Sequence, residues 1–310
     1  MADASLRELG QFLAGPGSLF NEPSPSLWLG LGALCLTLTL VVVLFLRPLV
    51  KDVRATRILA VIPFVALASV LLVLLTQWLA QCIRYLVHQS PMNAVRSVGY
   101  GPGLQAVGRI LFLIVAYIIS WGYSRSLEPD SFAQHVLSFT VGTGVVEELV
   151  KGAAGLMFIS ALRDGDPKEA PRRLILVAFT AAGFSFGAGE ALFYFQAYAG
   201  LGSEPGIYLL RGTWCVLLHG AWSFLTGLLF LVVAYLPHRI HGGVAAALFI
   251  ACCLPAAILH GLYDAACLHS PTAMWTVGAV SIGACLSGLL LLRWSYGPPC
   301  SENANSRLPR

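Results

Sequence analysis

The sequence has few charged residues for its length. Only 11% of its 310 residues are Asp, Glu, Lys or Arg, whereas 57% are apolar and the mean hydropathy is +0.76. A soluble domain carries about 25% charged residues, so this chain lacks the charge to coat a soluble protein of its size. The composition excludes a water-soluble fold and indicates a protein surrounded by lipid. The net charge of +4 is too small to indicate a nucleic-acid partner.

Several motifs of metal sites and proteases are also absent. The 8 cysteines include no CxxC pair, and most lie in or beside apolar runs, so we interpret them as small apolar residues. There is no HExxH motif, which excludes a zinc protease of that type. Asp264 is the one aspartate within an apolar run, so the pair that an intramembrane aspartyl protease needs is missing.

A GxSxG pattern is present at Gly183–Gly187, but it lies within an apolar run that predicts a helix. No strand precedes it, so the strand-to-helix turn of a serine hydrolase is not indicated. The two glycines instead predict GxxxG packing, in which a neighbouring helix approaches closely.

Long apolar runs dominate the chain. A bilayer core requires about 20 apolar residues per helix, and about eight runs of that kind occur between breaks rich in charge, Pro or Gly. They are Leu27–Leu46, Ile58–Ala80, Leu104–Tyr123, Phe132–Ile159, Leu174–Ala199, Tyr208–Leu236, Val244–Leu268 and Met274–Leu292. We therefore predict an all-α, polytopic membrane helical bundle with about eight transmembrane helices.

The predicted bundle is a single integral membrane domain over residues 27–297. A polar N-terminal segment, 1–26, precedes it, and a polar tail predicted to be disordered, 298–310, follows it. The fourth run contains Gly142 and Gly144 and predicts a short interfacial helix followed by a spanning one; the alternative is a re-entrant pair, which would change the number of spans.

The loop charges predict an orientation, because Lys and Arg favour the cytoplasmic side. With an even number of spans and the N-terminus inside, most loop Lys and Arg residues are cytoplasmic, although Arg47, Lys51, Arg54 and Arg57 violate the rule in the first loop. In this orientation the polar residues inside the later runs lie towards the non-cytoplasmic leaflet.

Seven ionisable residues fall inside the apolar runs: Glu147, Glu148, Lys151, Glu190, His219, His260 and Asp264. Each charge at mid-bilayer costs about 2.5 to 3.5 kcal/mol on insertion scales. Such a set is stable only if its members pair with one another, with water or with a metal. Their positions along the runs place them in one layer, so they predict a functional polar cluster.

Spacing within each run indicates which residues share a helix face. Glu147 and Glu148 both reach Lys151, so one carboxylate can pair with the ammonium while the other acts as a general base or ligand. His260 and Asp264 are four residues apart, so the carboxylate either orients the imidazole or ligates a metal beside it. A purely structural ion pair between Glu147 and Lys151 remains an alternative at this stage.

These residues form four ordered motifs: EExxK at Glu147–Lys151, FxxxE at Phe186–Glu190, His219, and HxxxD at His260–Asp264. In this pattern the chain resembles the PrsW family of intramembrane proteases, in the superfamily of the CAAX prenyl proteases. The resemblance covers about residues 145–264, within a motif-bearing core of about 132–268. The first three predicted helices carry no motif.

The resemblance implies an intramembrane protease that hydrolyses a peptide bond of a membrane-anchored protein substrate in or near the bilayer. It implies catalytic roles for Glu147, Glu148, Lys151 and Glu190, and metal ligation by His219, His260 and Asp264. The four carboxylates outnumber the one lysine, which favours a bound cation, and we expect it to be zinc. In this interpretation Glu148 is the base. A glutamate-dependent endopeptidase without metal is the other form that the superfamily suggests.

Two other functions are alternatives, and the second of them would use the same buried carboxylates as a relay. One is a non-catalytic membrane scaffold subunit related to the Aph subunit of γ-secretase, which the paired Glu147 and Glu148 argue against. The other is a proton- or ion-coupled transporter, for which no internal repeat is evident.

Overall fold

The computed structural model describes residues 55–89, 103–126, 128, 131–162, 172–200, 210–234 and 242–296. Every regular element within these ranges is helical, which confirms the all-α membrane bundle. The first predicted run and both polar terminal segments lie outside the described residues.

Each later run overlaps a helical element. The α-helices are α3 (Ala55–Gln89), α5 (Gly103–Arg125), α6 (Phe132–Phe139), α7 (Val145–Leu162), α8 (Arg172–Gly200), α10 (Val216–Ala234), α11 (Gly242–His269) and α12 (Pro271–Tyr296). Two π-helical segments, η2 (Thr140–Gly144) and η4 (Leu210–Cys215), lead directly into α7 and α10.

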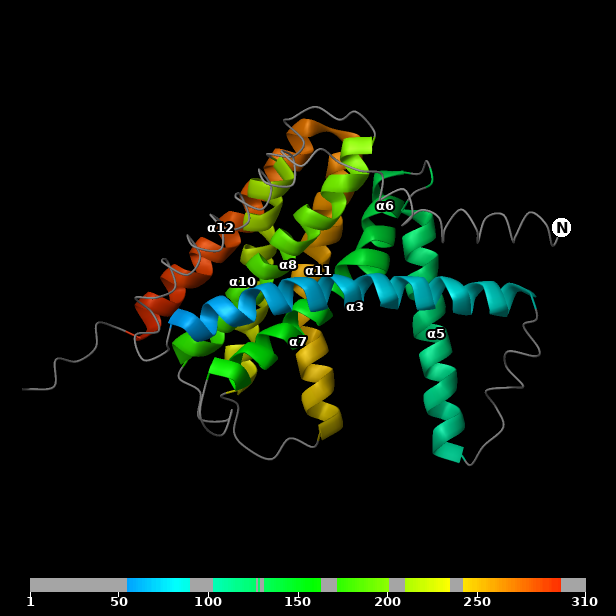
Figure 1. The fold of residues 1–310 in the computed structure, drawn as a ribbon, viewed down its shortest axis with the longest axis horizontal. Coiled ribbons are helices and arrows are strands. Elements are labelled where there is room, and N and C mark those ends of the chain that lie inside the picture. Colours follow the sequence, from blue (N-terminus) through cyan, green and yellow to red (C-terminus); the bar gives the residue numbers. More distant parts are fainter. Residues whose placement is uncertain are drawn as a thin grey trace, which may run out of the picture.

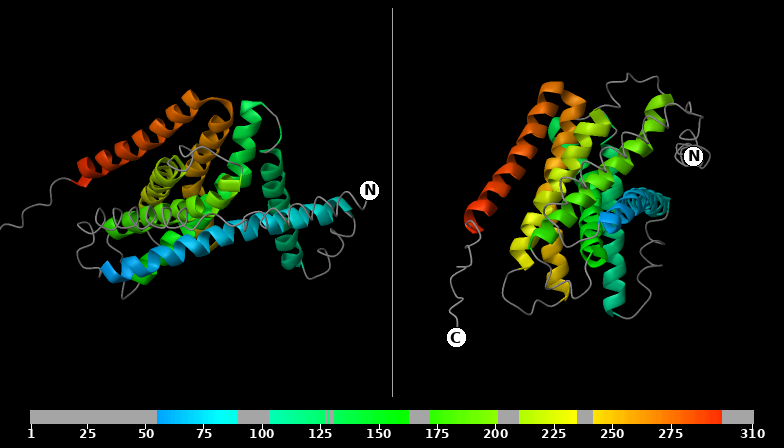
Figure 2. Two further views of the ribbon diagram at one scale, coloured as in Figure 1. Left: turned by 45° about the horizontal axis from the view of Figure 1, so that its top comes forward. Right: turned by 60° about the vertical axis from the view of Figure 1, so that its left-hand side comes forward.

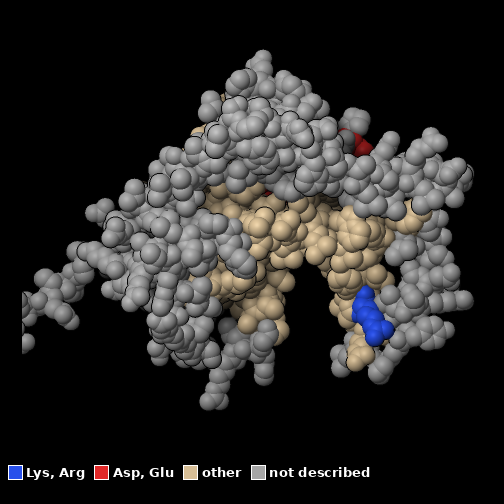
Figure 3. Space-filling view, in the orientation of Figure 1, with Lys and Arg blue, Asp and Glu red and all other residues tan. Residues whose placement is uncertain are grey.

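The number of candidate membrane spans differs from the prediction of about eight. Within the described residues, five helices are long and apolar enough to cross a bilayer: Val65–Tyr85, Gln105–Arg125, Leu174–Ala191, Gly212–Val233 and Gly243–His269. Helix α7 is not among them, because three ionisable residues fall in its first two turns. The described surface in Figure 3 is almost free of charge, as lipid contact requires.

Helices α7, α8, α10 and α11 form the centre of the bundle (Figure 1). The most extensive packing is between α8 and α10, and α3 crosses the bundle against α5, α7 and α8. Helix α12 returns along α11 and α10 at the edge of the bundle (Figure 2). Phe158 and Phe179, both fully buried, anchor an apolar core between α7 and α8.

The GxxxG interpretation of Gly183 and Gly187 is confirmed. A Cβ atom added to Gly183 would lie 2.3 Å from the carbonyl oxygen of His219, and one added to Gly187 would lie 3.0 Å from the Cα of Val216. The backbone of α10 therefore approaches α8 at a distance that only glycine permits. This close packing brings His219 next to the helix that carries Glu190.

Segment η2 is wedged between α5 and α11. A Cβ on Gly142 would lie 2.3 Å from the backbone nitrogen of Tyr123, and one on Gly144 would lie 2.5 Å from the carbonyl oxygen of Ala257. The predicted division of this run takes the form of a short α6 and a long α7, joined through the π-helical turn instead of a loop. Such π-helical insertions are frequent beside functional sites, and this one fixes where α7 begins.

Candidate functional site

The seven ionisable residues converge from four helices. Helix α7 provides Glu147, Glu148 and Lys151 in its first two turns, α8 provides Glu190, α10 provides His219, and α11 provides His260 and Asp264. Six of them are buried, and the seventh, Asp264, has a side chain that is 24% exposed. Asp264 is therefore the most accessible member of the cluster.

Lys151 lies at the centre of the cluster. Its side chain has no exposed area, and its ammonium forms an ion pair with Oε1 of Glu148. The same ammonium lies 2.8 Å from Nδ1 of His219 and 3.9 Å from Oε2 of Glu147. Lys151 thus compensates the charge of Glu148 more directly than that of Glu147, in contrast to the Glu147–Lys151 pair considered above.

The partners of His219 define its tautomer. An ammonium has only protons to donate, so Nδ1 of His219 accepts from Lys151. The other nitrogen, Nε2, therefore carries the ring proton and donates to Oε2 of Glu190 at 2.8 Å. A continuous chain of charge-assisted hydrogen bonds runs from Glu148 through Lys151 and His219 to Glu190.

His260 is held at both nitrogens as well. Its Nδ1 donates to Oε1 of Glu148 at 3.2 Å. Its Nε2 faces two other carboxylates, Oε2 of Glu147 at 3.7 Å and Oδ2 of Asp264 at 3.5 Å. Glu148 therefore lies behind the imidazole, whereas Glu147 and Asp264 share the side to which Nε2 points.

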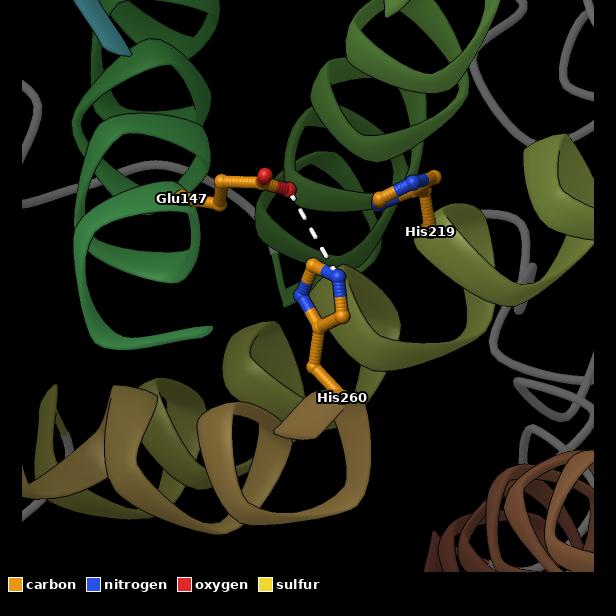
Figure 4. Close-up of side chains that lie close together, drawn as sticks. All are labelled: Glu147, His219 and His260. Atoms are coloured by element: carbon orange, nitrogen blue, oxygen red, sulfur yellow. Dashed lines mark ion pairs between the residues drawn. The ribbon is translucent and has the colours of Figure 1, made fainter. Parts of the chain in front are cut away.

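Three side chains meet the geometric condition for a metal site. One donor atom each from Glu147, His219 and His260 lies within 4.8 Å of the other two (Figure 4). The Oε2 atom of Glu147 is buried and has no hydrogen-bond partner among the described residues. His260 presents Nε2 while Nδ1 donates to a carboxylate, which is how metal-binding histidines are usually oriented.

The donor set suits a transition metal such as zinc, which prefers imidazole nitrogen and carboxylate oxygen. Of the three residues, His219 needs the largest change, because both of its nitrogens are already engaged, Nδ1 by Lys151 and Nε2 by Glu190. The residues present therefore fit a metal held by Glu147 and by Nε2 of His260, and by His219 after one of its two hydrogen bonds is broken.

A comparison with known protein families shows the family of this chain. Residues 103–290 match the family described as PrsW family intramembrane metalloprotease. The chain belongs to the PrsW family. The match extends beyond the four motifs to include α5 and most of α12, and it supports an intramembrane protease. No curated protein and no solved structure matches the chain.

Aromatic side chains around the cluster had no assigned role in the sequence analysis. The ring of Phe186 lies 4.9 Å from the ammonium of Lys151 and meets His219 edge-on. The indole of Trp222 contacts both histidines. Trp222 is three residues after His219, so it shares a helix face with that histidine, and this spacing was the available signal.

Proposed function

We propose that this PrsW-family protein hydrolyses a peptide bond of a membrane-anchored protein at the cluster of Glu147, His219 and His260. The observation that carries the proposal is a buried carboxylate oxygen that accepts no hydrogen bond from the described residues and lies beside an oriented imidazole. Oε2 of Glu147 faces Nε2 of His260, whose Nδ1 donates to Glu148.

This arrangement favours a different division of roles between the two glutamates from the one that the sequence suggested. We had expected Glu148 to be the base, but its Oε1 is shared by Lys151 and His260. A carboxylate held by two donors accepts a further proton poorly. The contacts support Glu147 as the group that accepts a proton from water, with Glu148 orienting His260 and Lys151 compensating the charge of Glu148.

The remaining groups complete the reaction site. His260 can polarise the scissile carbonyl or return a proton to the leaving amine, because its Nε2 faces Asp264, the most accessible member of the cluster. Glu190 and Lys151 hold His219 from opposite nitrogens, so the ring of His219 presents a fixed edge to the substrate. The peptide must unwind locally, because a helical peptide bond is shielded by its own hydrogen bonds.

A divalent ion fits the same three residues. Glu147, His219 and His260 would hold it, and we propose zinc on the basis of their nitrogen and oxygen donors. When bound, zinc would polarise the scissile carbonyl and lower the pKa of a water molecule to about 7. Glu147 would then be a ligand and not the base, and Asp264, 3.5 Å from His260, would be the nearest remaining carboxylate.

The same proposal includes the side of the membrane. The loop charges favour a cytoplasmic N-terminus, which puts the cluster nearer the non-cytoplasmic leaflet. A C-terminal reporter that is active only in the cytoplasm tests this orientation, because an even number of spans puts both termini inside. Activity of the reporter supports it, and inactivity of a well-expressed fusion reverses it.

The experiment that tests the function measures cleavage of a transmembrane reporter library by the purified, detergent-solubilised chain, together with its bound zinc. We compare the wild type with Glu147→Gln, Glu148→Gln and His260→Ala. Glu128→Gln is the matched control, because Glu128 pairs with Arg125 at an exposed position outside the cluster. The proposal predicts loss of cleavage in the three cluster variants and full cleavage in the control.

Bound zinc near one per wild-type chain, reduced in Glu147→Gln and His260→Ala, supports the metalloprotease form. Cleavage that persists after chelation supports the glutamate-dependent form instead. A folded wild type that cleaves no member of the library contradicts the proposal and favours the scaffold or transporter.

A further inference from the structure

Trp222 contacts both histidines of the cluster, although it belongs to none of the four motifs. It is 1% exposed and lies one helical turn after His219 on α10. Its indole stacks on the imidazole of His260, with ring centroids 4.4 Å apart and an interplanar angle of 20°. It meets His219 edge-on, with centroids 5.4 Å apart and an angle of 86°.

Trp222 is itself anchored by α12. Its Nε1–H donates to Oγ of Ser281 at 3.1 Å, and the Ser281 hydroxyl donates to the carbonyl oxygen of Val277 at 2.9 Å. Ser281 has no exposed area. An indole N–H can only donate, so a buried tryptophan requires an acceptor, and here a single hydroxyl on another helix provides it.

The stack restrains a movement of His260 that its polar partners do not. Glu148 contacts Nδ1 and Glu147 lies 3.7 Å from Nε2, so both carboxylates act at the edge of the imidazole. Tilting of the ring out of its plane is restrained by the indole that lies flat against it. The direction in which Nε2 points therefore depends on where Trp222 is held.

We propose that Trp222 is a positioning residue that sets the ring plane of His260, and that α12 acts on the site through the hydrogen bond from Trp222 to Ser281. The proposal rests on the proposed function for its effect on cleavage. It gives α12, which carries none of the seven ionisable residues, a defined part in arranging the site.

The test compares variants that remove the stack or its anchor. Trp222→Leu keeps an apolar side chain but removes the ring, and we expect kcat to fall about 10- to 100-fold with KM nearly unchanged, as for other groups that orient a ligating histidine. Trp222→Phe keeps a ring for stacking but loses the N–H. Ser281→Ala removes the acceptor, and we expect each of these two to lower kcat about two- to tenfold.

Two further variants make the result specific. Ser281→Thr retains the hydroxyl, so its kcat should equal that of the wild type and exceed that of Ser281→Ala. If the loss in Ser281→Ala came from a general packing defect, the threonine variant would lose kcat as well. Trp275→Phe is the matched control, because Trp275 lies on α12 with Ser281, is 49% exposed and contacts Trp214 instead of the cluster. It should cleave like the wild type.

A double-mutant cycle shows whether Ser281 acts through Trp222. In the Trp222→Phe background the indole donor is already gone, so Ser281→Ala should cause no further loss. Independent, multiplicative losses would contradict the anchor. An indole N–H resonance that is lost in Trp222→Phe and shifted in Ser281→Ala, measured with 15N-labelled tryptophan, reports the hydrogen bond without any cleavage assay.

The outcomes separate the two proposals. Cleavage by the wild type and its loss in Glu147→Gln decide the proposed function. If the wild type cleaves, equal kcat in Trp222→Leu and wild type overturns the positioning role and leaves the protease intact. A wild type that cleaves nothing removes the proposed function, and an indole resonance unchanged by Ser281→Ala then overturns the anchor on its own.

Discussion

Replacing Lys151 with methionine should destabilise the protein severely, whatever reaction it catalyses. Methionine has similar volume and no charge, so the change leaves Oε1 of Glu148 without its cation and Nδ1 of His219 without its donor. Breaking a buried ion pair by removing one partner costs about 3 to 5 kcal/mol. This is a large fraction of the about 5 to 15 kcal/mol that stabilises a typical protein.

The assay is thermal unfolding of the purified chain in one detergent. At about 2 to 4 °C per kcal/mol, a loss of about 3 kcal/mol lowers Tm by roughly 6 to 12 °C. The double variant Lys151→Met/Glu148→Gln should recover part of the loss, since a neutral amide replaces the unpaired carboxylate. A Tm within about 2 °C of wild type for Lys151→Met, or a double variant less stable than the single one, would refute the assignment of Lys151 as the partner of Glu148.

Three further predictions concern packing, hydrogen bonding and metal. Gly144→Ala should lower the free energy of unfolding by about 1 to 3 kcal/mol, because the added Cβ would lie 2.5 Å from a carbonyl oxygen. Gly108→Ala is the control: its Cβ would have no atom within 4 Å, so its Tm should equal that of the wild type. Glu190→Leu should lower cleavage about 10- to 100-fold, and Glu190→Gln should lower it less because an amide oxygen still accepts from His219; equal losses would contradict the hydrogen-bonding role. Zinc at 100 times its Kd should stabilise the wild type by about 2.7 kcal/mol and leave the Tm of Glu147→Gln unchanged; no zinc-dependent change in the wild type would contradict the metal site.

The sequence predicts the helices and the membership of the cluster for one physical reason. Charges are rare in apolar runs, and their burial cost is relieved only where several runs bring them together. Glu190 and His219, 29 residues apart, were therefore expected in one layer, and the structure places them in direct contact. The ends of the helices were harder to predict: α3 continues to Gln89, whereas the apolar pattern ends near Ala80.

The atomic partners within the cluster could not be predicted from spacing. Glu147 and Glu148 are four and three residues before Lys151, so both geometries allow an ion pair. The close approach of α10 places His219 beside the same ammonium, and this packing selects Glu148 as its carboxylate partner. The stack of Trp222 on His260 likewise depends on how α10 and α11 meet, which no local pattern encodes.

The glycines of η2 have a consequence for how this protein can diverge. At Gly142 and Gly144 the backbone of η2 lies directly against the backbones of α5 and α11. Main-chain contacts, and not side-chain shapes, therefore set the position of Glu147 and Glu148 along the bundle. Apolar residues that face lipid on α5 and α11 can be exchanged for others over evolutionary time without displacing Glu147 or Glu148. The two glycines have no such freedom, and the lipid-facing surface can therefore adapt to different membranes around a layer of ionisable residues that stays in place.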